Sequence, residues 1–250
     1  MTLENPQSFI TRQECDKVAF QNGFRRRHDE CNGWKHYSST TAQGSIWLAR
    51  DADDLWLLAI DHGGVIKELG IPSVAIEGPG LARYSFATLA QLYAVMPRLY
   101  QLANSLPDAP LQDYLHRTIN LPNTTEAERL VIQRVGQEVF RERLVDYWQG
   151  ECPLTGITDG ALLRASHIRP WADCTSDEER LDVHNGLLLS ALWDAAFDRG
   201  LVSFGDDGHP MFSSTLGEMA RRALAWREPI PLSEGHRERL SWHRDNLFIR

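Results

Sequence analysis

Apolar positions in the C-terminal half of the chain change their spacing between residues 150 and 200. Two short apolar runs, residues 152–157 and 162–168, flank the turn signal Thr158-Asp159-Gly160. This pattern predicts a β-hairpin. Pro170 ends the second run because proline cannot donate to a strand ladder. His167 is therefore expected near the end of a strand, facing a cleft.

A polar loop, residues 172–184, follows, and the apolar pattern resumes at helical spacing. The positions that recur are Leu187, Leu188, Ala191, Leu192, Ala195 and Ala196. Asn185 stands where an N-cap belongs, and Gly200 is placed to end the helix. We therefore expect one helix over residues 185–200.

Two acidic side chains share one face of this predicted helix, because Asp194 and Asp198 are four residues apart. Trp193 and Phe197 form a second pair one residue out of phase, and we expect this aromatic pair against the core. The carboxylates would then face the strand that bears His167. This arrangement is the geometry of a small metal site.

Each of these residues also has a structural interpretation. His167 beside Pro170 and Trp171 fits a packed or capping side chain, and Asn185-Gly186 fits a turn or cap. The two aspartates fit a solvated helix face, and Asp198 can pair with Arg199 to fix the helix end. Asp182 and His184 are the reserve candidates for metal ligation.

The N-terminal half has the most strand-like pattern of the chain. Residues 35–39, 44–50 and 55–61 are short apolar or aromatic runs separated by polar turns, which predicts an antiparallel meander. Helices are expected over residues 9–24, 63–70 and 85–105, the last interrupted at Pro97. The aromatic strand residues can stack nucleic-acid bases or simply form core.

A boundary is expected near Pro122. The capping box at Thr125 predicts a long helix over residues 126–148 that leads into the hairpin. A hairpin over residues 201–204 and 210–212 and helices over 216–226 and 233–248 complete the pattern. The prediction is an α+β protein of two domains: residues 1–122 form a β-meander with helices, and residues 123–250 contain the strand of His167 and the acidic helix.

Composition narrows the function classes. The chain has 250 residues and a formal net charge of −8, which argues against a broad polycationic surface but permits a local phosphate-binding groove. The four cysteines form no C-x-x-C pair, so no zinc knuckle is indicated. No apolar leader and no run of 18 apolar residues is present, so we expect a cytoplasmic location and no membrane partner.

Four motifs in fixed order carry a family resemblance: CPLTGI, LLRASHIRPW, LDVHNGLLL and FDRGLVSF. Together they resemble the HNH endonuclease family, in the subgroup of bacterial restriction-type nucleases, from Thr125 to the C-terminus. The resemblance implies a ββα-metal fold with one divalent ion. His167 would be the general base and Asn185 the middle residue of the signature.

The resemblance further implies Asp194 and Asp198 as metal ligands, with Asn185 as an additional candidate. Ser166 stands where many relatives have a ligand, and the last histidine of the signature is missing near Trp193 and Asp194. Carboxylate ligands suit Mg²⁺ or Mn²⁺.

These expectations combine into a metal-dependent HNH endonuclease that hydrolyses DNA in restriction or phage defence, in which residues 1–122 would recognise DNA and residues 123–250 would be the HNH endonuclease domain. Arg164, Arg169 and Arg141 are the candidate DNA contacts, and a homodimer is expected because double-strand cleavage needs two sites. Two alternatives stay open: a non-catalytic DNA-binding module with a decayed site, and an interbacterial DNase toxin. Metal-dependent plasmid cleavage that requires His167 would separate the enzyme from the binding module.

Overall fold

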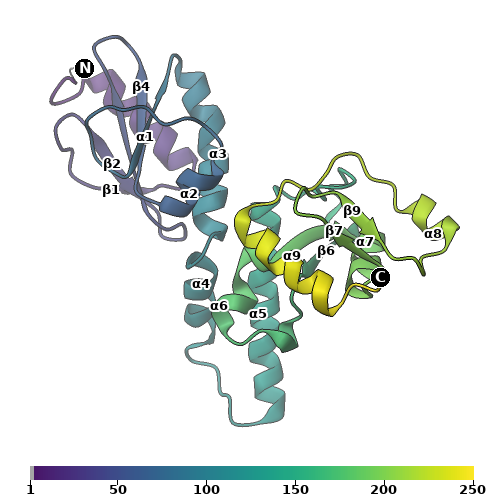
Figure 1. Cartoon of the computed structure of the whole chain (residues 1–250). Helices are drawn as coiled ribbons and strands as arrows, with labels where there is room; N and C mark the ends of the chain where they lie inside the picture. Colours follow the sequence, from purple (N-terminus) through teal and green to yellow (C-terminus); the bar gives the residue numbers. More distant parts are fainter. Residues whose placement is uncertain (1–2) are drawn as a thin grey trace. The chain divides into compact units, whose positions relative to one another are not determined.

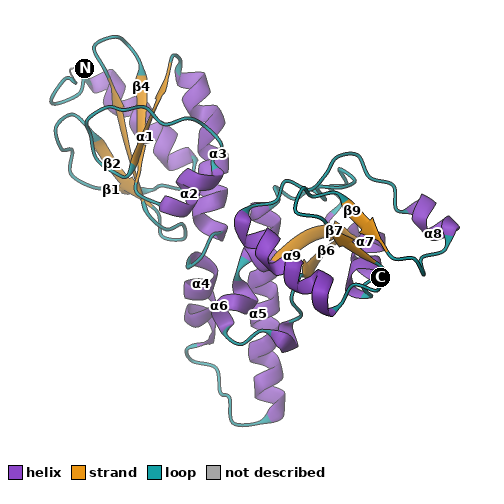
Figure 2. Cartoon of the chain, viewed as in Figure 1, coloured by secondary structure: helices purple, strands orange, loops and turns teal. Residues whose placement is uncertain are grey.

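A computed structural model describes residues 3–250 of the chain. It contains two compact units, of which the first ends at Ala109 and the second runs from Pro110 to Arg250. The functional domains predicted from the sequence divide instead at Pro122, and that functional division stays a prediction. The α+β class is confirmed, because both units combine helices with antiparallel sheet (Figures 1 and 2).

The first unit is built on a five-stranded antiparallel sheet in the order β1-β2-β3-β4-β5. The strands are β1 (Arg26–Arg27), β2 (Lys35–Ser38), β3 (Ser45–Arg50), β4 (Trp56–Ile60) and β5 (Ala82–Phe86). The predicted meander is confirmed as β2, β3 and β4. The two edge strands, β1 and β5, were not predicted.

Three helices accompany this sheet: α1 (Phe9–Gln21), α2 (Gly63–Glu68) and α3 (Leu89–Ser105). Both α1 and α3 contact the sheet, and the strand residues on that side, including Ile46, Leu48 and Leu58, are almost fully buried. Thr88 forms a capping box with Gln91, so α3 begins after β5 and not at Ser85. The helix continues through Pro97 without the predicted interruption.

In the second unit, α4 (Ala109–Thr118) precedes the long helix α5 (Glu126–Tyr147), whose N-terminus has the predicted capping box of Thr125 and Glu128. The chain then forms β6 (Leu163–His167), α6 (Asp177–Leu181), β7 (Gly186–Ser190) and α7 (Ala191–Asp198). Short 3-10 turns η1 (Gly160–Leu162), η2 (Trp171–Asp173) and η3 (Val183–Asn185) join these elements.

The remaining elements follow the predicted order. β8 (Val202–Phe204) and β9 (Pro210–Phe212) pair as an antiparallel hairpin, and α8 (Glu218–Ala223) and α9 (Glu234–Asn246) end the chain. Phe204, Trp193 and Phe197 are buried together, with ring centroids 5.7–6.1 Å apart between Phe204 and the other two. The aromatic pair of α7 therefore faces the core as predicted.

The strand pairing of β6 corrects the sequence-based hairpin. Residues 152–157 form a tight turn, closed by a hydrogen bond from Cys152 N to Ile157 O, and not a strand. The partner of β6 is β7, with His167 opposite Gly186 and Leu163 opposite Ser190. The segment predicted as the first part of a helix is thus a strand that is buried along its whole length.

The helix over residues 185–200 is accordingly shorter than predicted. It begins at Ala191 with Ser190 as the N-cap, so Asn185 does not cap it. The cause is packing: β7 supplies five consecutive buried residues, and a short apolar run fits strand and helix equally well by spacing alone. The observed order β6, β7, α7 is the ββα arrangement that the resemblance implied (Figure 2).

Candidate functional site

The site is centred on the contact between β6 and α7. Ser166 lies in β6 with only 2% of its surface exposed, and its hydroxyl donates a hydrogen bond to the Asp194 carboxylate. This contact fixes the half-buried Asp194 against the strand residue that directly precedes His167. Asp194 of α7 therefore contacts β6 through Ser166, whereas the next side chain, His167, points to the other face of the strand, toward α5.

His167 is half-buried and packed on two sides. Its ring stacks on Phe140 of α5, with centroids 3.8 Å apart and planes 17° apart, and Trp171 contacts it edge-on at 5.6 Å. Burial in these surroundings lowers the pKa of His167 to about 4. The imidazole is consequently neutral at neutral pH.

A backbone carbonyl determines the tautomer of His167. Its Nε2 lies 2.9 Å from the carbonyl oxygen of Arg180. A carbonyl can only accept, so in the neutral ring Nε2 carries the proton and donates. The lone pair that can accept a proton is then on Nδ1.

Asn185 holds the loop that supplies this carbonyl. Its side chain is completely buried. Oδ1 accepts from the backbone N–H of Arg169 at 2.9 Å, and Nδ2 donates to the carbonyls of Arg169 at 3.1 Å and Glu179 at 3.3 Å. Nδ2 also lies 3.4 Å from Cys174 Sγ. Asn185 thus joins the end of β6 to the residue that precedes Arg180.

The two carboxylates of α7 differ in their surroundings. Asp194 is half-buried beside Ser166, whereas Asp198 is exposed. Partial desolvation, together with the negative charge of Asp194, raises the pKa of Asp198. No ion pair within 4.0 Å joins Asp198 to Arg199 in the part of the chain that the structure describes, so that structural alternative is not observed.

The reserve candidates, Asp182 and His184, bind each other. Asp182 Oδ1 lies 3.0 Å from His184 Nδ1, and its Oδ2 lies 2.5 Å from Arg239. Desolvation opposes ionisation of Asp182, but the hydrogen bond from His184 and the charges of His184 and Arg239 prevail and lower its pKa. These groups stabilise the turn η3 against α9.

The three candidate DNA-binding arginines make bonds within the protein. Arg141 donates to the carbonyls of Leu163 at 3.1 Å and Gly160 at 3.0 Å, and so ties α5 to the start of β6. Arg169 pairs with Glu179 at 2.7 Å and lies over the Trp242 ring at 5.2 Å. Arg164 is exposed and donates to nearby backbone carbonyls, which leaves it the most accessible of the three.

Sequence reasoning missed the residues that surround His167. Phe140 lies in α5, a helix that the capping box predicted without indicating the stacking contact. Gly136, in the same helix, permits the approach of Trp171, since a Cβ there would lie 2.7 Å from the indole. The Arg180 carbonyl is a backbone group and has no signal in the sequence.

The side chains at this site do not form a multidentate cage. Among residues 3–250 no group of three or more His, Cys, Asp or Glu side chains is arranged to hold a metal ion. The carboxylates nearest to β6 are that of Asp194, which contacts Ser166, and, one helical turn later, that of Asp198. None of the helices within residues 3–250 is both long and apolar enough to cross a membrane.

Comparison with known proteins agrees with this geometry. No curated protein matches the chain. Residues 152–205, which include β6, β7, α7 and β8, match the sequence profile of the HNH endonuclease family. The family resemblance seen in the motifs is thereby confirmed over this segment, which has the sequence of an HNH endonuclease domain.

Proposed function

We propose that this protein is a metal-dependent endonuclease that hydrolyses phosphodiester bonds of DNA. One observation carries the proposal: a neutral imidazole at the end of β6 follows directly on the residue that contacts a carboxylate of α7. A proton acceptor and an anionic, cation-binding group therefore lie on adjacent elements. Hydrolysis of an anionic phosphodiester requires both.

The donors fit a hard divalent ion better than zinc. Mg²⁺ commonly binds proteins through one or two carboxylates and completes its shell with water and substrate phosphate, whereas structural zinc takes four protein ligands. Asp194 and Asp198 supply two carboxylates. The pKa of Asp198 is raised by partial desolvation and, second, by the charge of Asp194, and a cation would relieve that repulsion. We propose that Mg²⁺ or Mn²⁺ would be held here, and we leave Asn185 out of the proposed ligand set because its buried side chain is already bonded to the loop.

In this proposal His167 is the general base. Its Nδ1 accepts a proton from water, and the resulting hydroxide attacks the phosphorus. The Arg180 carbonyl keeps the ring in one tautomer and orientation. A bound divalent ion would neutralise charge on the scissile phosphate and the departing oxygen. Asn185 acts as a positioning residue, because it holds both ends of the loop that carries Arg180.

Cleavage of supercoiled plasmid with Mg²⁺ or Mn²⁺ tests the proposal. A general base contributes about 10²- to 10⁴-fold in rate, so His167→Ala is expected to lose at least about 10²-fold. EDTA is expected to abolish cleavage. His209→Ala, which alters an exposed histidine of β9's turn, is the matched control and should cleave like the wild type. Tight DNA binding without cleavage in any metal would instead identify a binding module.

We further propose a role in restriction or phage defence in the cytoplasm, with a homodimer as the acting species. One ββα site cuts one strand, so a double-strand break needs two copies. Nicked plasmid should then accumulate at low protein concentration, and linear plasmid should form with a steeper dependence on concentration. Phage plating on cells that express the wild type should fall relative to cells that express His167→Ala.

A further inference from the structure

The sheet of the first unit has an outer face, opposite α1 and α3, that carries a row of stacked rings. His28 stacks on His36 with centroids 4.3 Å apart, and His36 stacks on Trp47 at 4.6 Å with planes 13° apart. His36 and Trp47 are direct cross-strand partners of β2 and β3. The row places a half-buried indole in a fixed orientation on this face.

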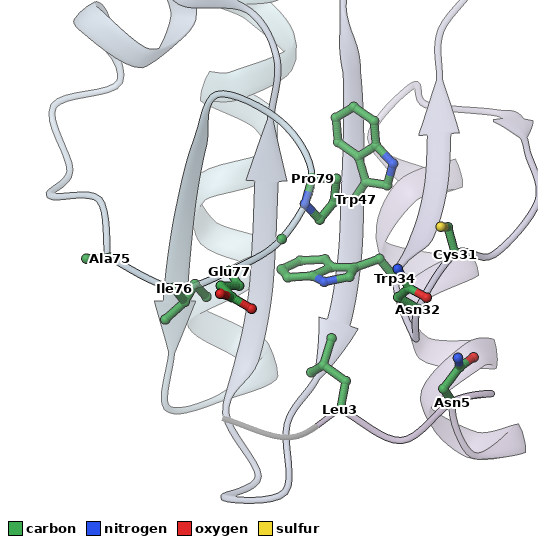
Figure 3. A pocket seen from close by; sticks show the side chains of 11 residues that line it. Leu3, Asn5, Cys31, Asn32, Trp34, Trp47, Ala75, Ile76, Glu77 and Pro79 are labelled. Carbon is green, nitrogen blue, oxygen red and sulfur yellow. The ribbon is translucent and has the colours of Figure 1, made fainter.

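A pocket of about 890 Å³ opens beside Trp47. Its apolar lining includes Trp34, Trp47 and Pro79, and its polar rim includes Asn5, Asn32 and Glu77. In Figure 3 the Trp34 indole lies between the loop that bears Glu77 and Pro79 and the turn that bears Asn32. Aromatic surface and hydrogen-bonding groups thus converge on one space.

Local structure holds this pocket open. The β4 partner of Trp47 is Ala59, and the indole packs against the buried cluster that contains Ala59 and Trp34, which fixes one wall of the pocket. Arg83 Nη1 donates to the carbonyls of Gly78, Pro79 and Gly80, so the loop on one side has a fixed path. On the other side Asn32 and Gly33 both have positive φ, 51° and 81°, as a type I′ turn requires.

The chemistry of the lining selects the ligand. The part of the Trp47 indole that lines the pocket suits a flat ring, because bases of any sequence stack on aromatic side chains. The Glu77 carboxylate accepts hydrogen bonds from amino groups, and the two asparagines can both donate and accept. Flat rings whose edges carry donors and acceptors together are nucleobases.

A cationic side chain lies on the same face. Arg26 pairs in register with Ser38, two residues from His36, so its exposed side chain projects from the outer face. Within residues 3–250 no hydrogen bond or ion pair of Arg26 is found, whereas Arg27 pairs with Asp16. Arg26 is therefore available for a backbone phosphate next to the ring row.

We propose that this pocket, here called the Trp47 pocket, binds a nucleobase that is unpaired and turned out of its DNA strand. The inference rests on the proposed function in one respect, that DNA is the ligand. It adds that the first unit distinguishes unpaired or extruded bases with an amino group from bases held in an intact duplex.

Binding of the full chain in EDTA tests this without cleavage. Fluorescence anisotropy compares a labelled duplex that contains one unpaired adenine with the same duplex fully paired. Stacking of about 1.4 kcal/mol corresponds to tenfold in affinity, so the wild type is expected to prefer the unpaired base by about tenfold or more. Trp47→Ala should reduce this preference to within about twofold. Trp226→Ala, at a partly exposed tryptophan of the second unit, should preserve it.

A second variant keeps the test decisive if Trp47→Ala does not fold, as judged by circular dichroism. Glu77 is exposed, so Glu77→Gln leaves the fold intact and should lower the preference for unpaired adenine severalfold. Equal binding of both duplexes by the wild type, or an unchanged preference in Glu77→Gln, overturns the inference. Plasmid cleavage without a preference would leave the nuclease proposal standing and reject the pocket, and a preference without cleavage would do the reverse.

Discussion

The burial of His167 has two opposite effects on its action as a general base. Burial against Phe140 and Trp171 lowers its pKa to about 4, which guarantees a free lone pair at neutral pH but makes the ring a weaker base. Orientation compensates in part, because the Arg180 carbonyl holds Nε2–H and leaves Nδ1 as the acceptor. Activity should therefore persist to mildly acidic pH and fall only as the pH approaches about 4.

Asp194 is the side chain whose replacement best tests the metal site. We predict that Asp194→Asn raises the Mn²⁺ concentration needed for half-maximal cleavage by about tenfold or more, since one anionic ligand is lost. The amide oxygen still accepts from Ser166, so the fold is kept. Asp194→Ala also leaves the buried Ser166 hydroxyl without its acceptor, and should additionally cost about 1–3 kcal/mol in unfolding free energy.

Metal titrations of cleavage and calorimetric Mn²⁺ binding give the two readouts for Asp194→Asn. Asp198→Asn is the matched comparison, because it removes the same charge one helical turn away from an exposed position. An unchanged metal requirement in Asp194→Asn would exclude Asp194 and direct the search to Asp198, Asp182 and His184.

The loop between β6 and β7 is the element on which the site depends. The Arg180 side chain spans the loop and donates to the carbonyls of Trp171 at 3.2 Å and Cys174 at 2.8 Å. The Asn185 side chain joins the two ends of the loop, because it accepts from Arg169 N and donates to the carbonyl of Glu179. The carbonyl that orients His167 is therefore fixed by a network and not by a single bond.

We predict that Asn185→Ala slows cleavage by about 10- to 100-fold and lowers the unfolding free energy by about 1–3 kcal/mol, because several buried groups lose their partner. The readout specific to positioning is the pH profile: with the loop released, the pKa of His167 should rise toward its ordinary value. Asn185→Asp, which keeps the acceptor for Arg169 N but not the donors, should be intermediate. A stability loss with an unchanged kcat and pH profile would reduce Asn185 to a structural role.

The sequence predicted the helices and strands of the first unit better than those around the candidate site. Strands β2, β3 and β4 have clear turns between them and were found, but β5 follows a Pro/Gly-rich connector and merged with the helical pattern of α3. In the second unit, the leucines of β7 fit helical spacing, so the strand was assigned to the helix and β6 received the wrong partner. The predicted position of Asp194 beside β6 did not depend on the partner of β6, because the face of α7 that packs against the core was predicted correctly.

The parts of the site that escaped prediction share a physical cause. The tautomer of His167 depends on a backbone carbonyl, and its pKa depends on a ring contributed by α5. Neither a main-chain atom nor a long-range packing contact is encoded by local spacing. The same holds for the Trp47 pocket: its aromatic strand residues have a signal in the sequence, but the position of residues 75–79 against them does not.

At the scale of the whole molecule, buried histidines with a lowered pKa occur in both units. Burial is the main cause in all of them: His36 and His62 in the first unit, His167 and His243 in the second. The pKa of His243 falls to about 4, and its ring is 1% exposed and stacks on Phe197 at 4.1 Å. These histidines couple the stability of both units to pH.

The direction of this coupling follows from proton binding. Below the ordinary histidine pKa of about 6.5 the unfolded chain takes up a proton that the folded chain does not, so stability is complete above that pH and is lost as the pH falls toward about 4. His167 and His243, whose pKa values fall to about 4, each contribute a slope of about 1.4 kcal/mol per pH unit within this window. We predict that the wild type loses several kcal/mol between pH 7 and pH 5.

Urea unfolding at pH 7, 6 and 5 measures these slopes. His243→Gln removes the titrating ring, so the slope of the transition that belongs to the second unit should fall by about 1.4 kcal/mol per pH unit, whatever the variant's stability at pH 7. His209→Gln, at an exposed position, is the matched control and should leave the slope unchanged. Because the two units can unfold in separate transitions, the one that responds to His243→Gln is thereby assigned to the second unit. Equal slopes for His243→Gln and the wild type would show that acid destabilisation arises elsewhere, and would place the proton uptake on carboxylates instead of on this buried ring.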